Sequence, residues 1–269
     1  MKMNLRNARA VCVALSVVVV LACQTVPITG RQQLSLIPMD TLLPMSFDAY
    51  KDFLSKHTVV QNTPEAAMVK RVGSRIRKAV ERYFAKNGLS DRLKGYRWEF
   101  NLVEDKGVNA WAMAGGKVVV YTGLLPVAAG ETGLAVVMGH EIAHAVASHG
   151  EERMSQGLLV QMGGVALSTA LSQSPQETAE LFMAAYGLGS QVGVLLPYSR
   201  LQESEADHLG LIFMAMAGYD PREATAFWRR MAQDKKGSPP EFLSTHPADT
   251  TRMRNIEALI PEALKYYRK

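Results

Sequence analysis

Apolar residues recur at helical spacing over most of this chain, and short runs rich in β-branched and aromatic residues interrupt them. Thr63 can cap a helix that starts at Pro64 and ends before Gly88, with apolar residues that follow the 3.6-residue period. Residues 96–105 and 116–125 contain alternating or continuous runs of Val, Tyr, Trp and Phe, which predict two strands. The pattern therefore predicts an α+β fold.

Helices dominate the rest of the pattern. We expect helices over about residues 132–148, over 199–217 with a stop at Gly218, over 221–233 after a cap at Asp220, and over 250–268. Gly115 and Gly116, between the two predicted strands, suit a tight turn. The expected fold is mainly helical.

Two uncharged stretches, residues 154–176 and 181–199, interrupt this pattern. By length alone, either could be considered as a membrane span. Gly, Ser and Gln residues break both stretches, so we expect helices that pack on the rest of the domain. A shallow contact with a membrane stays open as the alternative.

The first 22 residues differ from the rest of the chain. Lys2, Arg6 and Arg9 precede an apolar run over residues 10–22, which predicts a secretory signal too short to span a membrane. The sequence VLAC, which ends at Cys23, resembles the lipobox of bacterial lipoproteins, in which the cysteine is acylated. An ordinary signal peptide with an incidental cysteine is the alternative. We expect a signal peptide over 1–22, a lipidated tether over 23–45 and one folded domain over 46–269.

Composition and charge narrow the class of protein further. Of 269 residues, 48% are hydrophobic and 20% are charged, which is typical of a globular domain. The predicted signal peptide contributes three of the 30 basic residues and none of the 25 acidic ones, so the remaining excess of positive charge is small. We therefore expect no nucleic-acid partner. The two cysteines are Cys12, within the signal, and Cys23, so we expect no disulfide in the mature chain.

One predicted helix carries two histidines four positions apart, in the sequence HEIAH at residues 140–144. Positions i and i+4 lie on the same face of a helix, so His140 and His144 can present both imidazoles to one metal ion. Glu141 is offset by one residue, and it can take a proton from a water molecule that the metal polarises. A five-residue pattern also occurs by chance in helices whose histidines bind no metal, so the motif alone leaves both interpretations open.

A catalytic zinc site needs a third protein ligand and an open position. The segment SRLQESEADHLG, residues 199–210, offers Glu203 and Asp207, again four positions apart on a predicted helix. Glu203 can reach the metal, and Asp207 can accept a hydrogen bond from a ligand imidazole and fix its tautomer. Glu205 points about 160° away from that face, and His208 is also turned off it. In isolation the segment would be a solvated acidic helix, but its place after HEIAH favours the metal site.

HEIAH, followed in order by SRLQESEAD, AGYDP and STHP, resembles the HtpX-like zinc endopeptidases, a family that includes the CAAX prenyl endopeptidases. The resemblance runs from PITGRQQLSLI to the C-terminus and is greatest to the BepA-type and Oma-type branch. It implies a gluzincin-type core, with a small sheet over two metal-binding helices. It also implies that His140, His144 and Glu203 bind one zinc ion, that Glu141 is the base, and that Asp207 supports His140.

A second family motif, which resembles N-A-F-A-x-P-G-G, is present with two departures: Trp111 replaces Phe and Ala114 replaces Pro. We expect this segment to form an edge strand that binds extended substrate by strand addition, through Asn109, Ala110, Trp111 and Ala112. The BepA-type proteins also carry a helical repeat domain after the protease core. We expect no such domain here.

These features predict a zinc metalloendopeptidase that hydrolyses misfolded or misassembled cell-envelope polypeptides. The lipid on Cys23 would anchor it to a membrane. Because Gln24 is not the aspartate that commonly marks inner-membrane retention, we expect an outer membrane, with the domain facing the periplasm. Two other functions stay open: a metal-stabilised lipoprotein that binds misfolded proteins without cutting them, and a metallohydrolase for a small substrate. Glu141 favours hydrolysis, because a binding protein would not need a base.

His246 precedes a proline in a loop between two predicted helices. In the BepA-type relatives that STHP resembles, the equivalent histidine can sit on the metal, which would keep the enzyme latent until the loop moves. Alternatively, His246 stabilises the transition state, or it has only a structural role. His208 is a weaker candidate for the same position, because helix geometry turns it away from the metal.

Overall fold

In the computed structural model, the described residues are 23–170, 196–233, 241–246 and 250–268, with the single residues 172, 176, 180, 183 and 186. The predicted signal peptide and most of the second uncharged stretch lie outside the described residues. The chain divides into two compact units, Met1–Met39 with Gly150–Pro197 and Asp40–His149 with Tyr198–Lys269. The second unit contains the sheet and the residues of the predicted metal site.

The second unit contains all the strands of the sheet in its first half and only helices after them. Its first half contains α2 (Met39–Ser55), β3 (Val59–Val60), α3 (Pro64–Lys86), η1 (Ser90–Leu93), β4 (Glu99–Val103), β5 (Ala110–Met113) and β6 (Lys117–Tyr121). The rest contains η2 (Thr122–Leu124), α4 (Leu125–Ala128), α5 (Glu131–Val146), α8 (Leu196–Met216), α9 (Glu223–Gln233), α10 (Glu241–Thr245) and α11 (Thr250–Leu264). The mainly helical α+β class is thus confirmed.

The strands form one sheet with the order β3-β4-β6-β5 within the described residues. β4 and β6 are parallel, with Glu99 opposite Lys117, whereas β3 and β5 each pair antiparallel to their neighbour. Gly115 and Gly116 have φ values of 83° and 81°. Both residues therefore adopt the left-handed conformation that a tight connection from β5 to β6 requires. This topology places β5 at the edge of the sheet.

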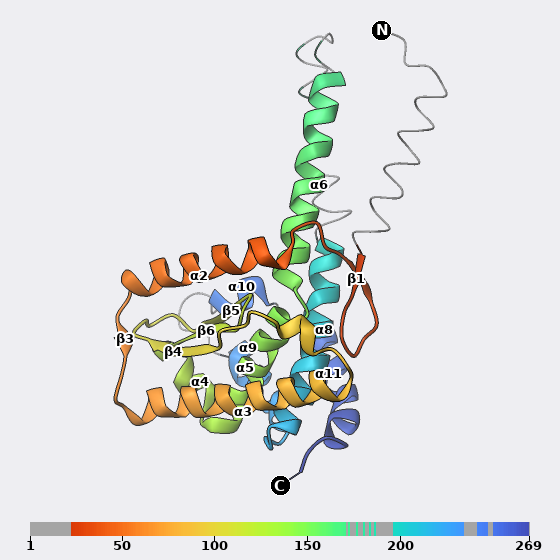
Figure 1. The fold of residues 1–269 in the computed structure, drawn as a ribbon. Coiled ribbons are helices and arrows are strands. Elements are labelled where there is room, and N and C mark those ends of the chain that lie inside the picture. Colours follow the sequence, from red (N-terminus) through yellow and green to blue (C-terminus); the bar gives the residue numbers. More distant parts are fainter. Residues whose placement is uncertain are drawn as a thin grey trace. The chain divides into compact units, whose positions relative to one another are not determined.

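Helices cover both faces of the sheet (Figure 1). α2 lies against one face, where Tyr50 joins Val119 and Tyr121 in a buried cluster. α3 lies against the other face, and it approaches so closely that a Cβ atom at Gly73 would overlap the ring of Phe100. α5 packs beside α3 and against β5. The sheet therefore supports α5, the helix that carries the HEIAH motif.

The helix boundaries follow the capping signals of the sequence, with small shifts. The hydroxyl of Thr63 accepts a hydrogen bond from the backbone of Ala66 at 3.1 Å, which confirms the predicted cap of α3. α9 starts at Glu223, two residues later than predicted. The reason is that the Asp220 carboxylate accepts a hydrogen bond from Arg222 N at 3.0 Å and holds a turn before the helix.

α5 is enclosed by the rest of its unit, because every residue from Gly133 to Val146 is buried. In its first turn, Glu131 accepts hydrogen bonds from Arg71 at 2.6 Å and from the hydroxyl of Tyr219 at 2.7 Å. The helix ends where Ser148 adopts a left-handed conformation with φ of 59°. The chain changes direction at this residue, and the next helix starts at His149.

The first unit combines a small hairpin with a long helix. Its strands are β1 (Cys23–Thr25) and β2 (Gln32–Leu34), which pair antiparallel, and its helix α6 spans His149–Ala170. The guanidinium of Arg31 donates to both carboxylate oxygens of Glu152 at 2.7 and 2.8 Å. Leu36 N also donates to the hydroxyl of Ser155 at 3.0 Å. Part of the segment expected to be a tether is therefore bonded to the start of α6.

α6 leaves large apolar side chains in contact with solvent. The exposed fractions are 41% for Met154, 42% for Leu158, 65% for Met162 and 63% for Val165. Over the described residues, no single helix is long and apolar enough to cross a membrane. By length and composition only, Thr122–Ala128 and Glu131–Val146 would qualify together, as a pair bent by 118°.

Candidate metal centre

Three side chains from two helices converge at one point. α5 presents His140 and His144, whose Nε2 atoms lie 3.0 Å apart. α8 presents Glu203, whose carboxylate oxygens lie 3.4 Å from His140 Nε2 and 3.2 Å from His144 Nε2. All three side chains are buried. The structure thus brings together the three residues that the sequence predicts as ligands.

The spacing of these atoms fits a tetrahedral zinc ion. Zinc binds imidazole nitrogen and carboxylate oxygen at about 2.0–2.2 Å, so neighbouring ligand atoms in a tetrahedron lie about 3.3 Å apart. The two Nε2 atoms lie 3.0 Å apart, and each lies near one Glu203 oxygen, His144 Nε2 at 3.2 Å from Oε1 and His140 Nε2 at 3.4 Å from Oε2, so all three distances are close to this value. Two imidazoles and one carboxylate also form a donor set found in catalytic zinc sites, where one position stays open.

His246 points into the same space from a different element. It follows α10, and its Nδ1 atom lies 3.2 Å from His140 Nε2 and 2.8 Å from Glu203 Oε2. Its ring stacks on Phe242 with the centroids 4.5 Å apart. The four candidate ligand atoms lie within 4.8 Å of one another. His246 Nδ1 therefore lies where a fourth ligand of the ion would lie.

Glu141 lies beside the convergent ligands and not among them. It follows His140 on α5, its side chain is 5% exposed, and its Oε1 atom lies 3.5 Å from His246 Nε2. A carboxylate at this position can take a proton from a water molecule at the metal and pass it to a leaving group. The offset is the one that the HEIAH sequence predicts.

The ligand helices are held in register by a contact between two glycines. A Cβ atom at Gly210 on α8 would lie 2.9 Å from His140 N and 3.0 Å from the carbonyl carbon of Gly139. A Cβ atom at Gly139 would lie 3.0 Å from the carbonyl oxygen of Gly210. The backbones of α5 and α8 therefore touch directly beside His140. This close approach fixes the distance between the histidines and Glu203.

Asp207 lies behind His140, one helical turn after Glu203. Its Oδ1 atom lies 2.9 Å from His140 Nδ1, where a carboxylate that orients the ring would lie. Arg252, on α11, donates to both Asp207 oxygens at 2.8 Å and lies 3.2 Å from Glu203 Oε2. The Arg252 guanidinium stacks over the ring of Trp228 at 3.8 Å. Neither Arg252 nor Trp228 could be predicted from the sequence, because no local pattern links α9 or α11 to the motif.

Burial and nearby charges act in opposite directions on the pKa values of this cluster. Burial lowers the pKa of His140, but hydrogen bonds to Asp207 and Glu203 outweigh it and raise the pKa to about 9. Burial would raise the pKa of Glu203, but hydrogen bonds to His140 and His144 hold it far below its usual range. Burial also lowers the pKa of His144 well below its ordinary value. The negative charge around the ring of His140 favours a cation there, whether a proton or a metal ion.

Comparison with models of protein families shows to which family the chain belongs. Residues 71–260 match the model of peptidase family M48. The chain belongs to this family. The resemblance based on HEIAH, SRLQESEAD, AGYDP and STHP is thereby confirmed.

Individual M48 relatives are similar over much of the chain. The mitochondrial metalloendopeptidase OMA1 of Schizosaccharomyces pombe is 36% identical over 88% of this chain and 66% of its own length. The Homo sapiens metalloendopeptidase OMA1 is 30% identical over 89% of this chain and 46% of its own. A putative beta-barrel assembly-enhancing protease of Vibrio cholerae is 33% identical over 57% of this chain and 33% of its own length. This chain therefore spans only part of the length of these relatives.

These relatives contradict the predicted location. Relatives from Schizosaccharomyces pombe, Saccharomyces cerevisiae, Bos taurus and Homo sapiens are named as mitochondrial enzymes. The prediction of an outer membrane facing the periplasm is therefore wrong. It depended on Gln24, and a single residue after a candidate lipidated cysteine does not identify a membrane.

The strand predicted to bind substrate is present, and its largest side chain packs on α2. β5 contains Ala110, Trp111 and Ala112, and Asn109 directly precedes it. The ring of Trp111 packs edge-on against Phe53 of α2, with the centroids 4.8 Å apart. Trp111 therefore anchors the strand to α2, and the contribution of this segment to substrate binding would come from its backbone.

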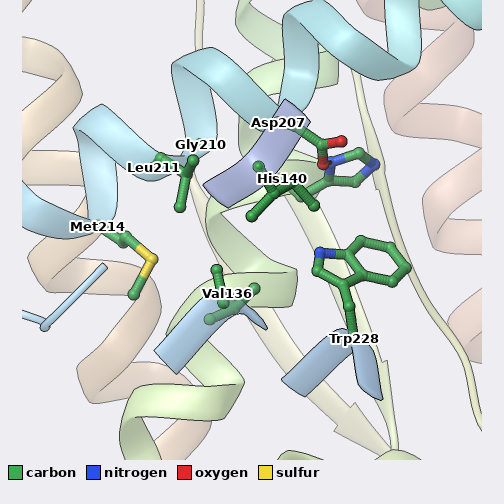
Figure 2. A pocket seen from close by; sticks show the side chains of 9 residues that line it. Val136, His140, Asp207, Gly210, Leu211, Met214 and Trp228 are labelled. Carbon is green, nitrogen blue, oxygen red and sulfur yellow. Dashed lines mark ion pairs between the residues drawn. The ribbon is translucent and has the colours of Figure 1, made fainter. Parts of the chain in front are cut away.

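A small pocket lies behind the M48 motif, on the side of His140 that faces Asp207 (Figure 2). Figure 2 shows the imidazole of His140 beside the Asp207 carboxylate, with the indole of Trp228 next to them. The other lining residues are apolar or glycine: Val136, Gly210, Leu211, Met214, Ala224 and Ile256. The pocket on this side of the carboxylate is therefore mostly apolar.

Proposed function

We propose that this M48 protein is a zinc-dependent endopeptidase that cleaves unfolded or misassembled polypeptides. One observation carries the proposal: two imidazoles and a carboxylate converge at the separations of zinc ligands, with Glu141 directly beside them. A zinc ion held there would polarise a water molecule and a peptide carbonyl. A structural zinc site needs no adjacent base, so the position of Glu141 beside the cluster supports hydrolysis.

Glu141 performs the proton transfers in this proposal. Its carboxylate takes a proton from the attacking water, and the resulting carboxylic acid gives that proton to the leaving amine. Burial next to His246 keeps Glu141 out of bulk water between the two transfers. The neighbouring ligands hold the water and the carbonyl in place, because Asp207 and the contact between Gly139 and Gly210 restrict their movement.

The substrate would bind in an extended form along β5. This strand ends the sheet within the described residues, and α5 packs against it. A peptide added to the edge would pair with backbone groups, which every sequence offers. Recognition of this kind selects for chains that can become extended, so it favours unfolded or misassembled polypeptides over folded ones.

The position of His246 supports latency in this proposal. Its Nδ1 atom lies at the position of a fourth ligand, which an active enzyme must leave open for water. Phe242 N, on the same short helix, donates to the carbonyl of Val108, just before β5, at 3.2 Å. A substrate strand that displaces this bond would also loosen the segment that carries His246. Substrate binding would thereby activate the enzyme.

Replacement of Glu141 tests the hydrolytic function. We expect Glu141→Gln to retain one zinc ion per chain and to cleave casein at least about a hundredfold more slowly, since a neutral amide cannot accept the proton. Glu104→Gln, at an exposed glutamate, is the matched control and should keep full activity. Glu203→Ala should lose both zinc and activity. Wild-type cleavage by Glu141→Gln would refute the mechanism, and a wild-type protein without zinc would refute the metal site.

Replacement of His246 tests latency separately. We expect His246→Ala to cleave casein faster than the wild type and to cut itself more readily, because the fourth position becomes open. His208→Ala, whose histidine contacts Glu262 and lies outside the four-residue cluster, is the control. A slower His246→Ala enzyme that keeps its zinc would assign His246 to stabilisation of the transition state instead.

We further propose that Cys23 carries a lipid that anchors the protein to a membrane. Cys23 is the first residue of β1, and Arg31, in the turn after this strand, is bonded to Glu152 of α6. A lipid on Cys23 would therefore be attached to folded structure. Palmitate labelling should be lost in Cys23→Ala, and labelling that persists in this variant would exclude the site.

A further inference from the structure

A buried histidine lies behind the second metal ligand, outside the residues that the proposed mechanism uses. His149 is fully buried, with 0% exposure. Its Nδ1 atom lies 2.8 Å from His144 Nδ1, and its Nε2 atom lies 3.0 Å from Glu205 Oε2. Glu205 and His144 are 5% exposed each. The three side chains form a continuous row from the carboxylate of Glu205 to the metal position.

The backbone turn at Ser148 makes this contact possible. His149 follows His144 by five residues, so on an uninterrupted helix the two side chains would point about 140° apart. The left-handed conformation of Ser148, with φ of 59°, ends α5 and turns the chain before His149. As a result, the rings of His144 and His149 meet at an angle of 77° with their centroids 4.8 Å apart.

Glu205 reaches this row from the opposite side of α8. The sequence places Glu205 away from the face that carries Glu203, and the structure agrees, because the two carboxylates make different contacts. Glu203 faces the imidazoles directly, whereas Glu205 contacts His149. This connection could not be predicted from the sequence, because it depends on a turn and a helix crossing that no local spacing reveals.

One arrangement of protons satisfies both contacts when Glu205 is ionised and His149 is neutral. An ionised carboxylate only accepts hydrogen bonds, so His149 must donate from Nε2 to Glu205. In a neutral imidazole the other nitrogen is then an acceptor, so His149 Nδ1 accepts from His144 Nδ1–H. His144 is left with a lone pair on Nε2, the atom that faces His140 and Glu203. This is the tautomer that a metal ligand requires.

We propose that Glu205 and His149 form a relay that positions His144, as Asp207 does for His140. Each ligand imidazole then has a carboxylate that sets its tautomer and ring orientation, one in direct contact and one through a second histidine. His149 and Glu205 are positioning residues, because neither touches the metal position. The inference rests on the zinc site of the proposed function.

Three variants of the relay test this assignment through zinc affinity. Each full-length protein is titrated with zinc in competition with a fluorescent chelator, so no substrate is needed. We expect His149→Leu and Glu205→Leu to bind zinc about 10–100-fold more weakly than the wild type. His149→Gln should stay close to wild-type affinity, because its amide offers one acceptor to His144 and one donor to Glu205. His208→Ala, on the same helix as Glu205, is the control and should bind zinc normally.

A spectroscopic measurement tests the proton positions directly. Long-range ¹H–¹⁵N correlation spectra of the zinc-loaded wild-type protein report which ring nitrogens carry protons. We expect His144 to be protonated only on Nδ1 and His149 only on Nε2. A merely structural role for His149 does not predict this pair of tautomers. A proton on Nδ1 of His149 would overturn the relay, whether or not the leucine variants fold.

The outcomes separate this inference from the function on which it rests. A wild-type protein that does not bind zinc would overturn both the proposed enzyme and the relay. A wild-type protein that binds zinc, with leucine variants of equal affinity, would overturn the relay alone. A glutamine variant as weak as the leucine variant would also overturn it, because lost packing and not lost hydrogen bonding would then explain the effect.

Discussion

α5 and α6 follow each other directly in the chain, yet they differ in how much of their apolar surface is buried. Both contain an uncharged stretch, residues 132–139 in α5 and residues 154–170 in α6. α5 is buried from Gly133 to Val146, whereas α6 exposes between 41% and 65% of Met154, Leu158, Met162 and Val165. A helix that is apolar on all sides is normally enclosed by protein or lipid. The comparison shows that apolar composition predicts a helix but does not say what covers it.

Matched truncations test this difference most strongly. Leu134, on α5, is 0% exposed, and Leu158, on α6, is 42% exposed. We expect Leu134→Ala to lower the free energy of unfolding by about 2–5 kcal/mol, because it leaves a cavity in the core. Leu158→Ala should change it by less than about 1 kcal/mol. Urea unfolding of the two variants measures both values, and equal losses would show that α6 is covered in solution.

Added methyl groups test the same comparison in the opposite direction. Gly210→Ala places a Cβ atom against the backbone of α5, so we expect a loss of about 1–3 kcal/mol and weaker zinc binding as the helices separate. At Gly157 of α6, a Cβ atom would meet nothing within 4 Å. Gly157→Ala should therefore stabilise the protein by up to about 1 kcal/mol, through helix propensity alone. Thermal unfolding measures the stability of both variants. A Gly210→Ala variant as stable as the wild type would contradict the close contact between the two helices.

The smallest effect concerns the start of α5. A hydrogen bond from Arg71, with a second from Tyr219, holds the pKa of Glu131 below its ordinary value. A lowered pKa means stability that is present above the unfolded pKa of about 4.3 and is lost as the pH falls through the folded value. Glu131→Gln should therefore cost less than about 1 kcal/mol at pH 7 and progressively less below pH 4. A cost that grows as the pH falls would contradict this assignment.

The part of the site that depends on local geometry could be predicted from the sequence. His140, His144 and Glu141 follow from helix periodicity, and Glu203 follows from the order of the motifs, without knowledge of the fold. The helix capped by Thr63 was predictable for the same reason, since the capping hydroxyl and the bonded backbone are three residues apart.

The rest depends on contacts between distant elements. The parallel pairing of β4 with β6 requires a crossover that periodicity does not encode. Arg252 reaches Asp207 from α11, and His149 reaches His144 only because Ser148 turns the chain. Sequence spacing describes one helix at a time, so it misses residues whose role arises where helices meet.

The contact between Gly139 and Gly210 also bears on the chain that connects α5 to α8, the two helices that carry the candidate ligands. Because the two backbones touch where they cross, we expect the spacing of the ligands to be insensitive to the length of the chain that connects α5 to α8. Insertions or deletions in the connecting chain would then leave the distances between the candidate ligands unchanged. The crossing thus makes the connecting region a place where related enzymes can acquire new surfaces and keep the same chemistry.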